Sequence, residues 1–511
     1  MRRRPLLALV ASGVLVAAVV LRFWTRSDLW FDEALSVNIA RLPLGQIPDA
    51  LRHDGHPPLY YFLLHVWIDV FGIGDFAVRA LSGVLSLATL PLVWFAGRRV
   101  GSRAVAWTAV LVVALSPFAF RYGTEARMYS LVMLFVVAGY LALRRALEVP
   151  TIARLTLVAV ITAGLVLTQY WDLYLVALVG AALAYCAGRA PGAADRRAAL
   201  RVFGAVAIGS LAFAAWLPVF LDQIGHTGTP WGDPQFPWVV VPRALIAFAG
   251  SEKDGEAYML ALLLLVLPLL ALFGRGLDQR RIELDLRTRA AVRWEAAAAF
   301  GVLLLGSVIS YVTDTTFQPR YSATIFPIVA IVAAFGVTVF LDQRVRIALL
   351  AIIAVLGVAG GLRNVTYQRT QAGEAAEIIA SEARPGDVVA YCSDQLGPDV
   401  SRLLRDVPPA SRTSRSLEQV TFPGSGAPDR VNWTDYIDRV RRADPAAFAH
   451  DALDRAGDHT VWFVWAPGLN HLERACQEIG ATLDSARDPR IRVIGGRQVL
   501  EVRALTEYRA P

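Results

Sequence analysis

The chain has 511 residues, of which 55% are hydrophobic and 18% are charged, and its formal net charge is +7. Soluble domains carry about a quarter charged residues, so this composition excludes an ordinary soluble fold, and so apolar a chain is not intrinsically disordered. Nucleic-acid binding is excluded as well, because the positive charge is distributed over separate loops and not gathered on one face, and the composition therefore predicts a membrane protein.

Long uncharged stretches occur as far as residue 362. A helix needs about 20 mostly apolar residues to cross the hydrocarbon core. Eleven stretches of 16 to 21 residues lack Asp, Glu, Lys and Arg, and they are 5–21, 80–97, 104–120, 128–143, 155–171, 173–188, 202–221, 257–274, 296–313, 321–341 and 347–362. We expect a polytopic α-helical membrane protein with about eleven transmembrane helices. The first stretch follows Arg2, Arg3 and Arg4 as in a secretory signal, but no clear small-x-small cleavage site follows it, so we expect it to be retained.

The distribution of basic residues predicts the orientation of these helices. Loops on the cytoplasmic side of a membrane are enriched in Lys and Arg. If the N-terminus is cytoplasmic, the inside segments hold 21 basic residues, whereas the outside loops, although longer in sum, hold ten. The sequence therefore predicts a multi-pass protein of the plasma membrane with a cytoplasmic N-terminus and with residues 363–511 outside the cytoplasm.

The first outer loop, about residues 22–79, carries two polar motifs. It opens with Asp28-Leu29-Trp30-Phe31-Asp32-Glu33, in which two adjacent carboxylates lie just beyond the membrane surface. Further on, His56-Pro57-Pro58 begins the uncharged stretch 55–68, which is too short to span comfortably. We expect this stretch to form an interfacial helix that starts at the prolines.

Two later outer loops place charged residues beside tyrosines. The short loop 121–129 holds Glu125 between Arg121 and Arg127 and ends in Tyr129. The loop 314–321 ends in Gln318-Pro319-Arg320-Tyr321. By the predicted topology, both loops lie on the same membrane face as the carboxylates of the first outer loop.

The composition changes after residue 362, where charged residues, Pro and Gly become frequent. Alternating helix-like and strand-like segments predict a small α/β domain. These segments are the amphipathic Glu374 to Ala383, the strand-like Asp387 to Tyr391, the strand-like Thr460 to Trp465 and the helix-like Leu469 to Ile479. We therefore expect a transmembrane domain over residues 1–362 and a soluble extracytoplasmic α/β domain over residues 363–511.

The cysteines do not suggest a metal site. Cys186, Cys392 and Cys476 have no metal-ligand spacing, which argues against a zinc or iron–sulfur centre. Cys392 and Cys476 lie on the predicted oxidising side, where a disulfide and two buried free thiols are both consistent with the sequence.

Each charged outer residue also has a structural interpretation. An Asp-Glu pair after a span is commonly a solvated helix start, an arginine at a membrane edge commonly reaches lipid headgroups, and a lone histidine is more often a hydrogen-bonded structural group. A functional site is favoured because an independent count of charges assigns one membrane face to Asp32, Glu33, His56, Glu125, Arg127 and Arg320. Carboxylates and guanidiniums that converge there suit a reaction of an anionic lipid headgroup.

The order of these motifs resembles that of the GT-C glycosyltransferases, within them the branch of protein O-mannosyltransferases, lipid A aminoarabinose transferases and related bacterial enzymes. The match is densest over about residues 28–145, weaker to about 345, and absent from the tail. No single motif is specific, and the ordered set carries the resemblance: a first span, Phe31-Asp32-Glu33, His56-Pro57-Pro58, Phe76-Ala77-Val78-Arg79, Tyr122-Gly123-Thr124-Glu125-Ala126-Arg127 and Pro319-Arg320-Tyr321.

The resemblance implies a membrane glycosyltransferase that takes a sugar from a polyprenyl-phosphate donor at the outer face and passes it to an acceptor hydroxyl with inversion. It implies that Asp32 is the catalytic base, Glu33 the neighbouring acid and Glu125 the second-loop acid. The other matched positions are Arg79, which resembles the arginine that pairs with the neighbouring acid, His56 of the His-Pro-Pro motif, and Arg320, which resembles the arginine that meets the donor phosphate.

The chemistry is consistent with these roles. An inverting transfer needs one carboxylate to accept the proton of the attacking hydroxyl, and Asp32 fits that need. Negative charge grows on the leaving lipid phosphate, so fixed cations stabilise the transition state. Arg127 and Arg320 are the candidates, with Tyr129 and Tyr321 as hydrogen-bond donors.

No cofactor is expected to be required. A phosphate monoester leaving group needs less charge neutralisation than a nucleotide diphosphate, so a metal is optional. A divalent cation, which some members of the resembled family hold, would find suitable ligand types in Asp32, Glu33, Glu125 and His56.

Two other function classes are compatible with a polytopic chain. One is a transporter or flippase of a lipid-linked sugar, although transporters tend to carry ionisable residues near the midplane of their spans and internal repeats, and neither is evident here. The other is a non-catalytic assembly partner, which the intact Asp32-Glu33 pair argues against. The sugar, and whether the acceptor is a lipid, a protein or a glycan, are left open by the sequence.

Overall fold

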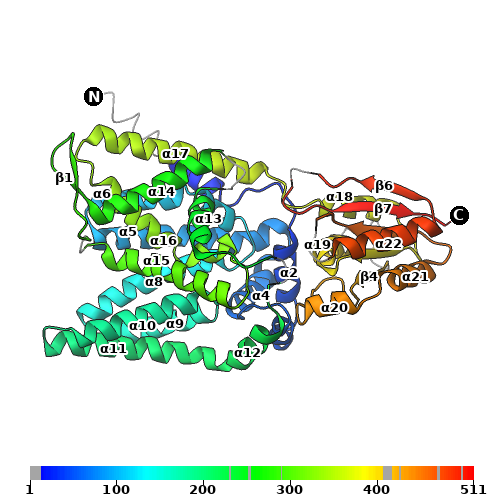
Figure 1. The fold of residues 1–511 in the computed structure, drawn as a ribbon, viewed down its shortest axis with the longest axis horizontal. Helices are drawn as coiled ribbons and strands as arrows, with labels where there is room; N and C mark the ends of the chain where they lie inside the picture. The colour runs from blue at the N-terminus through cyan, green and yellow to red at the C-terminus, as the bar shows by residue number, and fades with distance from the viewer. Residues whose placement is uncertain are drawn as a thin grey trace.

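The computed structural model describes residues 13–229, 232–250, 255–288, 291–406, 417–424, 427–468, 472–496 and 499–510. Arg2, Arg3, Arg4 and much of the first predicted span, with its signal-like features, lie outside these residues. A long bundle of helices occupies one end of the molecule and a smaller α/β unit occupies the other (Figure 1).

Helices joined by short turns build the bundle. Residues 13–20 are helical, and the next elements are α2 (Phe31–Ala40), η1 (Leu44–Gln46), α3 (Ile47–Arg52), α4 (Leu59–Phe71), α5 (Asp75–Val100), α6 (Arg103–Ala114), α7 (Pro117–Gly123), α8 (Tyr129–Glu148) and α9 (Ile152–Val166). They are followed by α10 (Asp172–Gly188), α11 (Ala193–Ser210), η2 (Leu211–Ala215), α12 (Leu217–His226), α13 (Pro237–Ala249), α14 (Gly255–Phe273), the antiparallel strands β1 (Gly274–Gly276) and β2 (Ile282–Leu284), α15 (Arg293–Val312), η3 (Pro319–Thr324), α16 (Phe326–Val337) and α17 (Gln343–Thr366).

Fewer helices than predicted are long enough to span a membrane. In the described part of the chain, five are long and apolar enough, and the count rises to six if α6 and α7, which are bent by 55°, form one span. Other predicted spans coincide with apolar helices of 10–17 residues, such as α9, α10 and α16. One reason is that the outer end of a predicted span can adopt a conformation other than the α-helix. The predicted span 321–341, for example, begins in the 3₁₀ helix η3, and α16 starts only at Phe326, with Pro327 in its first turn. The lengths support a polytopic membrane protein and do not by themselves reach eleven spans.

The two short helices of the first outer loop have different surroundings. Helix α4 begins directly after Pro58, as the sequence predicts. In α2, every residue from Phe31 to Ala40 is buried. The Asp32-Glu33 pair therefore does not lie on a solvated helix start, and the structural interpretation of these two carboxylates is wrong.

The arginine-rich connections lie at the far end of the bundle. Helices α5 and α8 run side by side, and Arg99 in the last turn of α5 forms an ion pair with Glu148 at the end of α8, with Nη2 and Oε2 2.9 Å apart. The β1–β2 hairpin marks the same end, whereas α2 and the α/β unit lie at the other end (Figure 1). The loops with many arginines and the carboxylates of α2 are thus at opposite ends of the helices.

The α/β unit is a five-stranded sheet covered by helices on both faces. Its elements are α18 (Ala372–Glu382), β3 (Val388–Cys392), η4 (Asp394–Leu396), α19 (Gly397–Asp406), β4 (Glu418–Phe422), α20 (Tyr436–Arg442), α21 (Pro445–Ala456), β5 (Val461–Trp465), α22 (Glu473–Ala486), β6 (Pro489–Val493) and β7 (Ala504–Tyr508). The strand order is β4-β3-β5-β7-β6, with β3 parallel to β4 and β5, and β7 antiparallel to β5 and β6.

Successive side chains of a central strand point to opposite faces of the sheet, which explains why helices cover both faces. Val388 and Ala390 belong to a cluster that includes residues of α21 and α22, whereas Val389 and Tyr391 join residues of α18 and α19. Because both faces are covered, β3 is apolar throughout, as is typical of buried parallel strands. The predicted strands at 387–391 and 460–465 coincide with β3 and β5, but the helix predicted at 469–479 is α22, which runs from Glu473 to Ala486; residues 469–471 lie outside the described part.

A disulfide joins the end of β3 to α22. Cys392 and Cys476 are bonded, with their Cα atoms 5.5 Å apart, so the structure selects this alternative over two free thiols. The two residues are 84 apart in sequence, so the bond closes a long loop of the unfolded chain.

Removal of this disulfide is expected to lower the free energy of unfolding of the α/β unit by about 4 to 5 kcal/mol, because a loop of this length loses that much chain entropy when it is closed. Chemical denaturation of the full-length protein with Cys392 and Cys476 both replaced by Ala measures the loss. The control is Cys186→Ala, which removes an exposed free thiol. Equal denaturation midpoints for the double variant and the control would contradict the prediction.

Candidate active site

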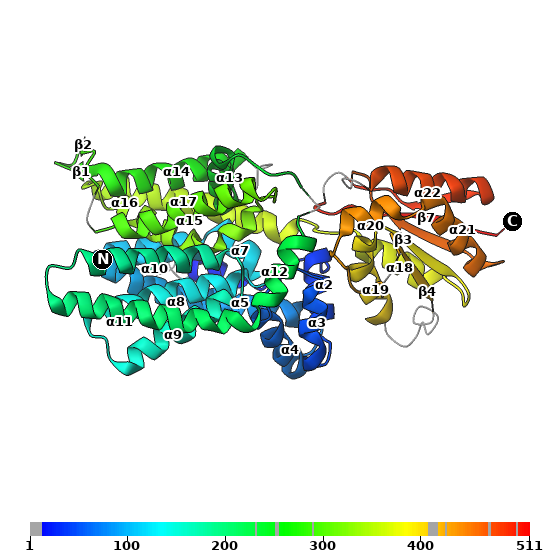
Figure 2. The ribbon, with the colours of Figure 1, turned by 60° about the horizontal axis from the view of Figure 1, so that its bottom comes forward.

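Helix α2 carries the two carboxylates into the junction between the bundle and the α/β unit. Figures 1 and 2 both place α2 between the bundle and α19, which packs on it. The helix begins after the extended residue Trp30, whose N–H lies 3.5 Å from Oε2 of Glu33 in a capping-box arrangement. Acidic residues in a first turn are stabilised by the positive end of the helix dipole, so the sequence Asp32-Glu33 suits this position.

Glu33 is fully buried and holds several loops together. Its carboxylate accepts two hydrogen bonds from Arg79, from Nε to Oε1 at 2.7 Å and from Nη2 to Oε2 at 2.6 Å. The backbone N–H of Ala126 donates to Oε1 at 2.9 Å. Although burial acts to raise it, Arg79 and then Arg369 lower the pKa of Glu33 to about 2. Glu33 is therefore ionised at neutral pH and acts as an anchor, and the pairing with Arg79 expected from the resemblance is present.

Asp32 is the more accessible of the two carboxylates. Its Oδ2 lies 2.9 Å from Nη1 of Arg320, and 12% of the Asp32 side chain and 21% of the Arg320 side chain are exposed. Beyond this ion pair, Oδ2 accepts no hydrogen bond from the described residues. Burial lowers the pKa of Arg320, but Asp32 and then Tyr129 outweigh it and raise the pKa, so the guanidinium stays charged. A partly exposed carboxylate beside a fixed cation is what a base next to an anionic leaving group requires.

Arg127 lies beneath α2. Its Nη1 donates to Oγ of Ser36 at 2.9 Å, and its Nη2 is 3.0 Å from Nε2 of His56. Because Nε2 faces a guanidinium, it acts as the acceptor, and Nδ1 donates to Oδ2 of Asp54 at 3.1 Å. Arg127 and His56 thus support the helix that carries Asp32. The sequence predicts that Arg127 contacts the donor phosphate, but its side chain is buried and directed toward Ser36 and His56.

Glu125 and the two predicted tyrosines complete the cluster. Oε2 of Glu125 accepts a hydrogen bond from Nε of Arg121 at 2.9 Å, while burial raises the pKa of Glu125 in spite of Arg121. The ring of Tyr129 packs on Tyr122 with centroids 4.7 Å apart, and the ring of Tyr321 stacks on Trp171 at 5.7 Å. The structure therefore brings every predicted site residue to one end of the bundle.

Several buried polar atoms of this cluster have no hydrogen-bond partner among the described residues. They are Asp32 Oδ2, Glu125 Oε1, Tyr129 Oη, Arg127 Nε and Arg320 Nε. Buried polar groups in proteins are nearly always hydrogen-bonded, so a concentration of unpaired donors and acceptors marks a place where a polar substrate or water supplies the missing partners.

The predicted metal ligands are not arranged as a cluster. Across the described residues, which include Asp32, Glu33, Glu125 and His56, no three His, Cys, Asp or Glu side chains come together as a metal site. His56 uses both ring nitrogens on Arg127 and Asp54, and Asp32 pairs with Arg320. Each of these four candidate ligands thus contacts an arginine side chain.

Some residues of the site are not evident in the sequence. Asp54 accepts hydrogen bonds from His56 and, at 2.8 Å, from the hydroxyl of Tyr61. Arg369, after α17, lies 3.5 Å from Glu33. The position of Asp54 two residues before the His-Pro-Pro motif is a signal that sequence reasoning missed, whereas no local pattern points to Arg369.

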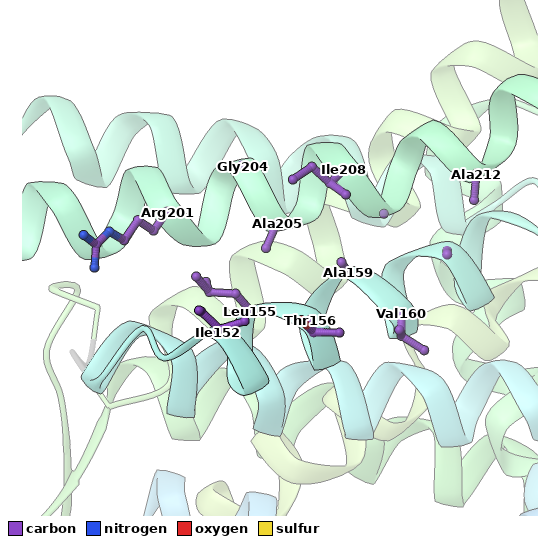
Figure 3. A pocket seen from close by; sticks show the side chains of 12 residues that line it. Ile152, Leu155, Thr156, Ala159, Val160, Arg201, Gly204, Ala205, Ile208 and Ala212 are labelled. Atoms are coloured by element: carbon purple, nitrogen blue, oxygen red, sulfur yellow. The ribbon is translucent and has the colours of Figure 1, made fainter.

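A groove lies elsewhere on the bundle. Helices α9 and α11 border a groove of about 510 Å³ lined mainly by apolar and small side chains, with Arg201 toward one end (Figure 3). None of the predicted site residues lines this groove, and its open apolar wall is typical of a surface that faces lipid. The predicted site residues therefore lie around α2 and not at this groove.

Comparison with known proteins supports the predicted resemblance. Residues 55–220 match the family model described as dolichyl-phosphate-mannose-protein mannosyltransferase. No curated protein matches the chain by sequence. The resemblance to GT-C glycosyltransferases is confirmed by this match together with the fold.

Solved structures share the fold at low sequence identity. ArnT from Cupriavidus metallidurans in the apo state has a TM-score of 0.62 and 13% identity, over 99% of this chain and 98% of that chain. The same protein bound to undecaprenyl phosphate has a TM-score of 0.55 and 14% identity with the same coverage. The oligosaccharyltransferase of Archaeoglobus fulgidus in complex with Zn and sulfate has a TM-score of 0.51 and 11% identity, over 89% of this chain and 68% of that chain.

Proposed function

We infer that the chain is a membrane glycosyltransferase of the GT-C fold that transfers a sugar from a polyprenyl-phosphate donor to an acceptor hydroxyl. The pair of Asp32 and Arg320 carries this inference, because it combines a partly exposed carboxylate with a fixed cation 2.9 Å from its Oδ2. The fold is that of ArnT, one structure of which contains undecaprenyl phosphate.

The proposed reaction is a single inverting displacement. The acceptor oxygen forms a bond to the anomeric carbon while the bond from that carbon to the phosphate oxygen breaks and leaves a polyprenyl phosphate. Asp32 takes the proton of the acceptor hydroxyl. Arg320 pairs with Asp32 through Nη1, and its Nε has no hydrogen-bond partner among the described residues, so this N–H remains for the growing charge on the phosphate. Tyr129 and Tyr321 are proposed as additional hydrogen-bond donors to the substrate.

We propose that Arg127, His56, Arg79, Glu33 and Glu125 hold the reacting groups in place. Glu33 and Arg79 form the buried ion pair under the first turn of α2. Removing one partner of such a pair leaves an unpaired buried charge, which would destabilise the first turn of α2. We therefore assign these residues a positioning role and not a direct part in the reaction.

We propose the plasma membrane as the location, with a cytoplasmic N-terminus, about eleven spans and the active site on the outer face. The excess of arginine in loops at the end of the bundle away from α2 supports this orientation. We also propose the division into a transmembrane domain up to about residue 362 and an extracytoplasmic α/β domain after it, although α17 continues to Thr366.

Transfer is expected from purified protein in lipid nanodiscs that is offered a panel of synthetic polyprenyl-phosphate sugars, with products identified by mass spectrometry. Lipid, protein and glycan acceptors are tested in parallel, because the acceptor class is open.

We expect transfer to persist after chelation of divalent cations, because Arg320 supplies the positive charge. Loss of transfer on chelation and its rescue by a metal would instead indicate a cation at Asp32, Glu125 and His56. Movement of labelled donor across liposomes without any transfer would favour a flippase and contradict the proposal.

A further inference from the structure

The α/β unit makes direct polar contacts with the active-site helix. A Cβ atom added to Gly373 at the start of α18 would lie 2.1 Å from Oδ2 of Asp28, so the two parts of the chain approach as closely as a glycine permits. Asn38 near the end of α2 donates from Nδ2 to the backbone oxygens of Pro398 at 3.1 Å and Asp429 at 2.9 Å. The unit therefore contacts both the segment that precedes α2 and the C-terminal end of α2.

Glu501, in the segment before β7, contacts the first turn of α2 directly. The backbone N–H of Phe31 donates to Oε2 of Glu501 at 3.0 Å. This N–H belongs to the residue immediately before Asp32, at the helix end where unpaired N–H groups and the helix dipole attract a carboxylate. The two residues are 470 apart in sequence.

Glu501 is itself held by a buried network within the α/β unit. Nη2 of Arg503 donates to Oε2 of Glu501 at 2.9 Å and to Oδ2 of Asp399 at 2.8 Å. Asp399 is buried in α19 and accepts a further hydrogen bond from the hydroxyl of Thr370 at 3.2 Å. The carboxylate that meets α2 is thus fixed by the folded unit and is not a mobile surface group.

Arg369 makes a second connection. It lies in the linker between α17 and α18, and its side chain approaches Glu33 in the first turn of α2. Its side chain is fully buried and donates from Nη1 to the backbone oxygen of Thr124 at 2.7 Å and from Nη2 to Oγ1 of Thr124 at 2.7 Å. Nη1 also lies 3.5 Å from Oε2 of Glu33. The same linker residue donates its backbone N–H to Oγ of Ser27 at 2.8 Å.

We propose that the C-terminal α/β unit is a positioning element of the active site, with Glu501 and Arg369 as positioning residues that fix the first turn of α2 and hence the carboxylate of Asp32. The inference rests on the proposed function, because it concerns the placement of the proposed base. A displacement of about 1 Å in a reacting group costs as much as about 100-fold in rate, so a loosened first turn lowers the rate of the chemical step.

The test compares Glu501→Ala with Glu507→Gln in the full-length protein. Glu507 is a matched control because it is a buried carboxylate of the same unit that pairs with Arg492 at 2.8 Å, within the unit. We expect Glu501→Ala to lower kcat by about 10-fold to 100-fold with the KM for the donor within about twofold, and Glu501→Gln, which keeps an acceptor oxygen, to recover part of the loss. Glu507→Gln is expected to leave kcat within about twofold.

Hydrogen–deuterium exchange supplies a readout that does not depend on activity. In Glu501→Ala, the amides of residues 29–36 are expected to exchange faster while those of α22 are unchanged. Unchanged exchange and an unchanged kcat in Glu501→Ala would overturn the positioning role, and so would an equal loss of kcat in Glu507→Gln, which would indicate general destabilisation. Failure of the wild type to transfer any sugar would count against the proposed function alone, since the exchange measurement would still decide whether Glu501 holds α2.

Discussion

Replacing Asp32 by Asn is expected to lower kcat for sugar transfer by about 10²-fold to 10⁴-fold, the range that a positioned general base contributes. The amide has the shape of the carboxylate but cannot accept the proton of the acceptor hydroxyl. It also carries no charge to pair with Arg320, which lies 2.9 Å from Oδ2. Single-turnover transfer from a polyprenyl-phosphate sugar measures the chemical step without a contribution from product release.

The matched control for this variant is Asp69→Asn in the same outer loop. Asp69 lies on α4, its side chain is 68% exposed, and it pairs with His65. Its replacement is expected to leave transfer unchanged. Wild-type transfer by Asp32→Asn would remove Asp32 from the chemistry, whereas equal loss in both variants would indicate damage to the loop as a whole.

The second large effect is expected at Arg320. Its replacement by Ala removes a cation from the leaving phosphate, and one such group is typically worth about 3 to 4 kcal/mol of transition-state stabilisation, or about 10²-fold to 10³-fold in kcat. Arg320→Lys keeps the charge but has a single ammonium in place of the planar fork that reaches both Asp32 and a phosphate, so we expect an intermediate rate. Steady-state kinetics with the same donor measure both variants.

Arg344→Ala is the control for the loss of an arginine. Arg344 is exposed in the first turn of α17, at the end of that helix away from the α/β unit. We expect no change in transfer. If Arg320→Ala changed only the KM for the donor and left kcat intact, Arg320 would bind the phosphate equally in the ground state and the transition state, which would contradict the proposed stabilisation of the leaving group.

Much of the site was predictable because its residues belong to local motifs with a shared sidedness. The sequence places Asp32, Glu33, His56, Glu125 and Arg320 in loops of one membrane face, and the structure brings them together. The ordered motifs also indicated that Arg79 pairs with Glu33. The environment of Arg127 was not predictable, since only packing beneath α2 directs its guanidinium toward Ser36 and His56.

By itself, the sequence determined the membrane class, the helix of the first outer loop that follows Pro58, and the alternation of helices and strands in the tail. These features follow from local composition, because apolar run length, proline and hydrophobic periodicity act over a few residues. Only the tertiary structure decided which helices are long enough to span, that Cys392 bonds Cys476, and that Glu501 meets the N–H of Phe31. Contacts between residues hundreds of positions apart leave no local pattern, because they arise when the folded α/β unit packs on the helix that carries Asp32.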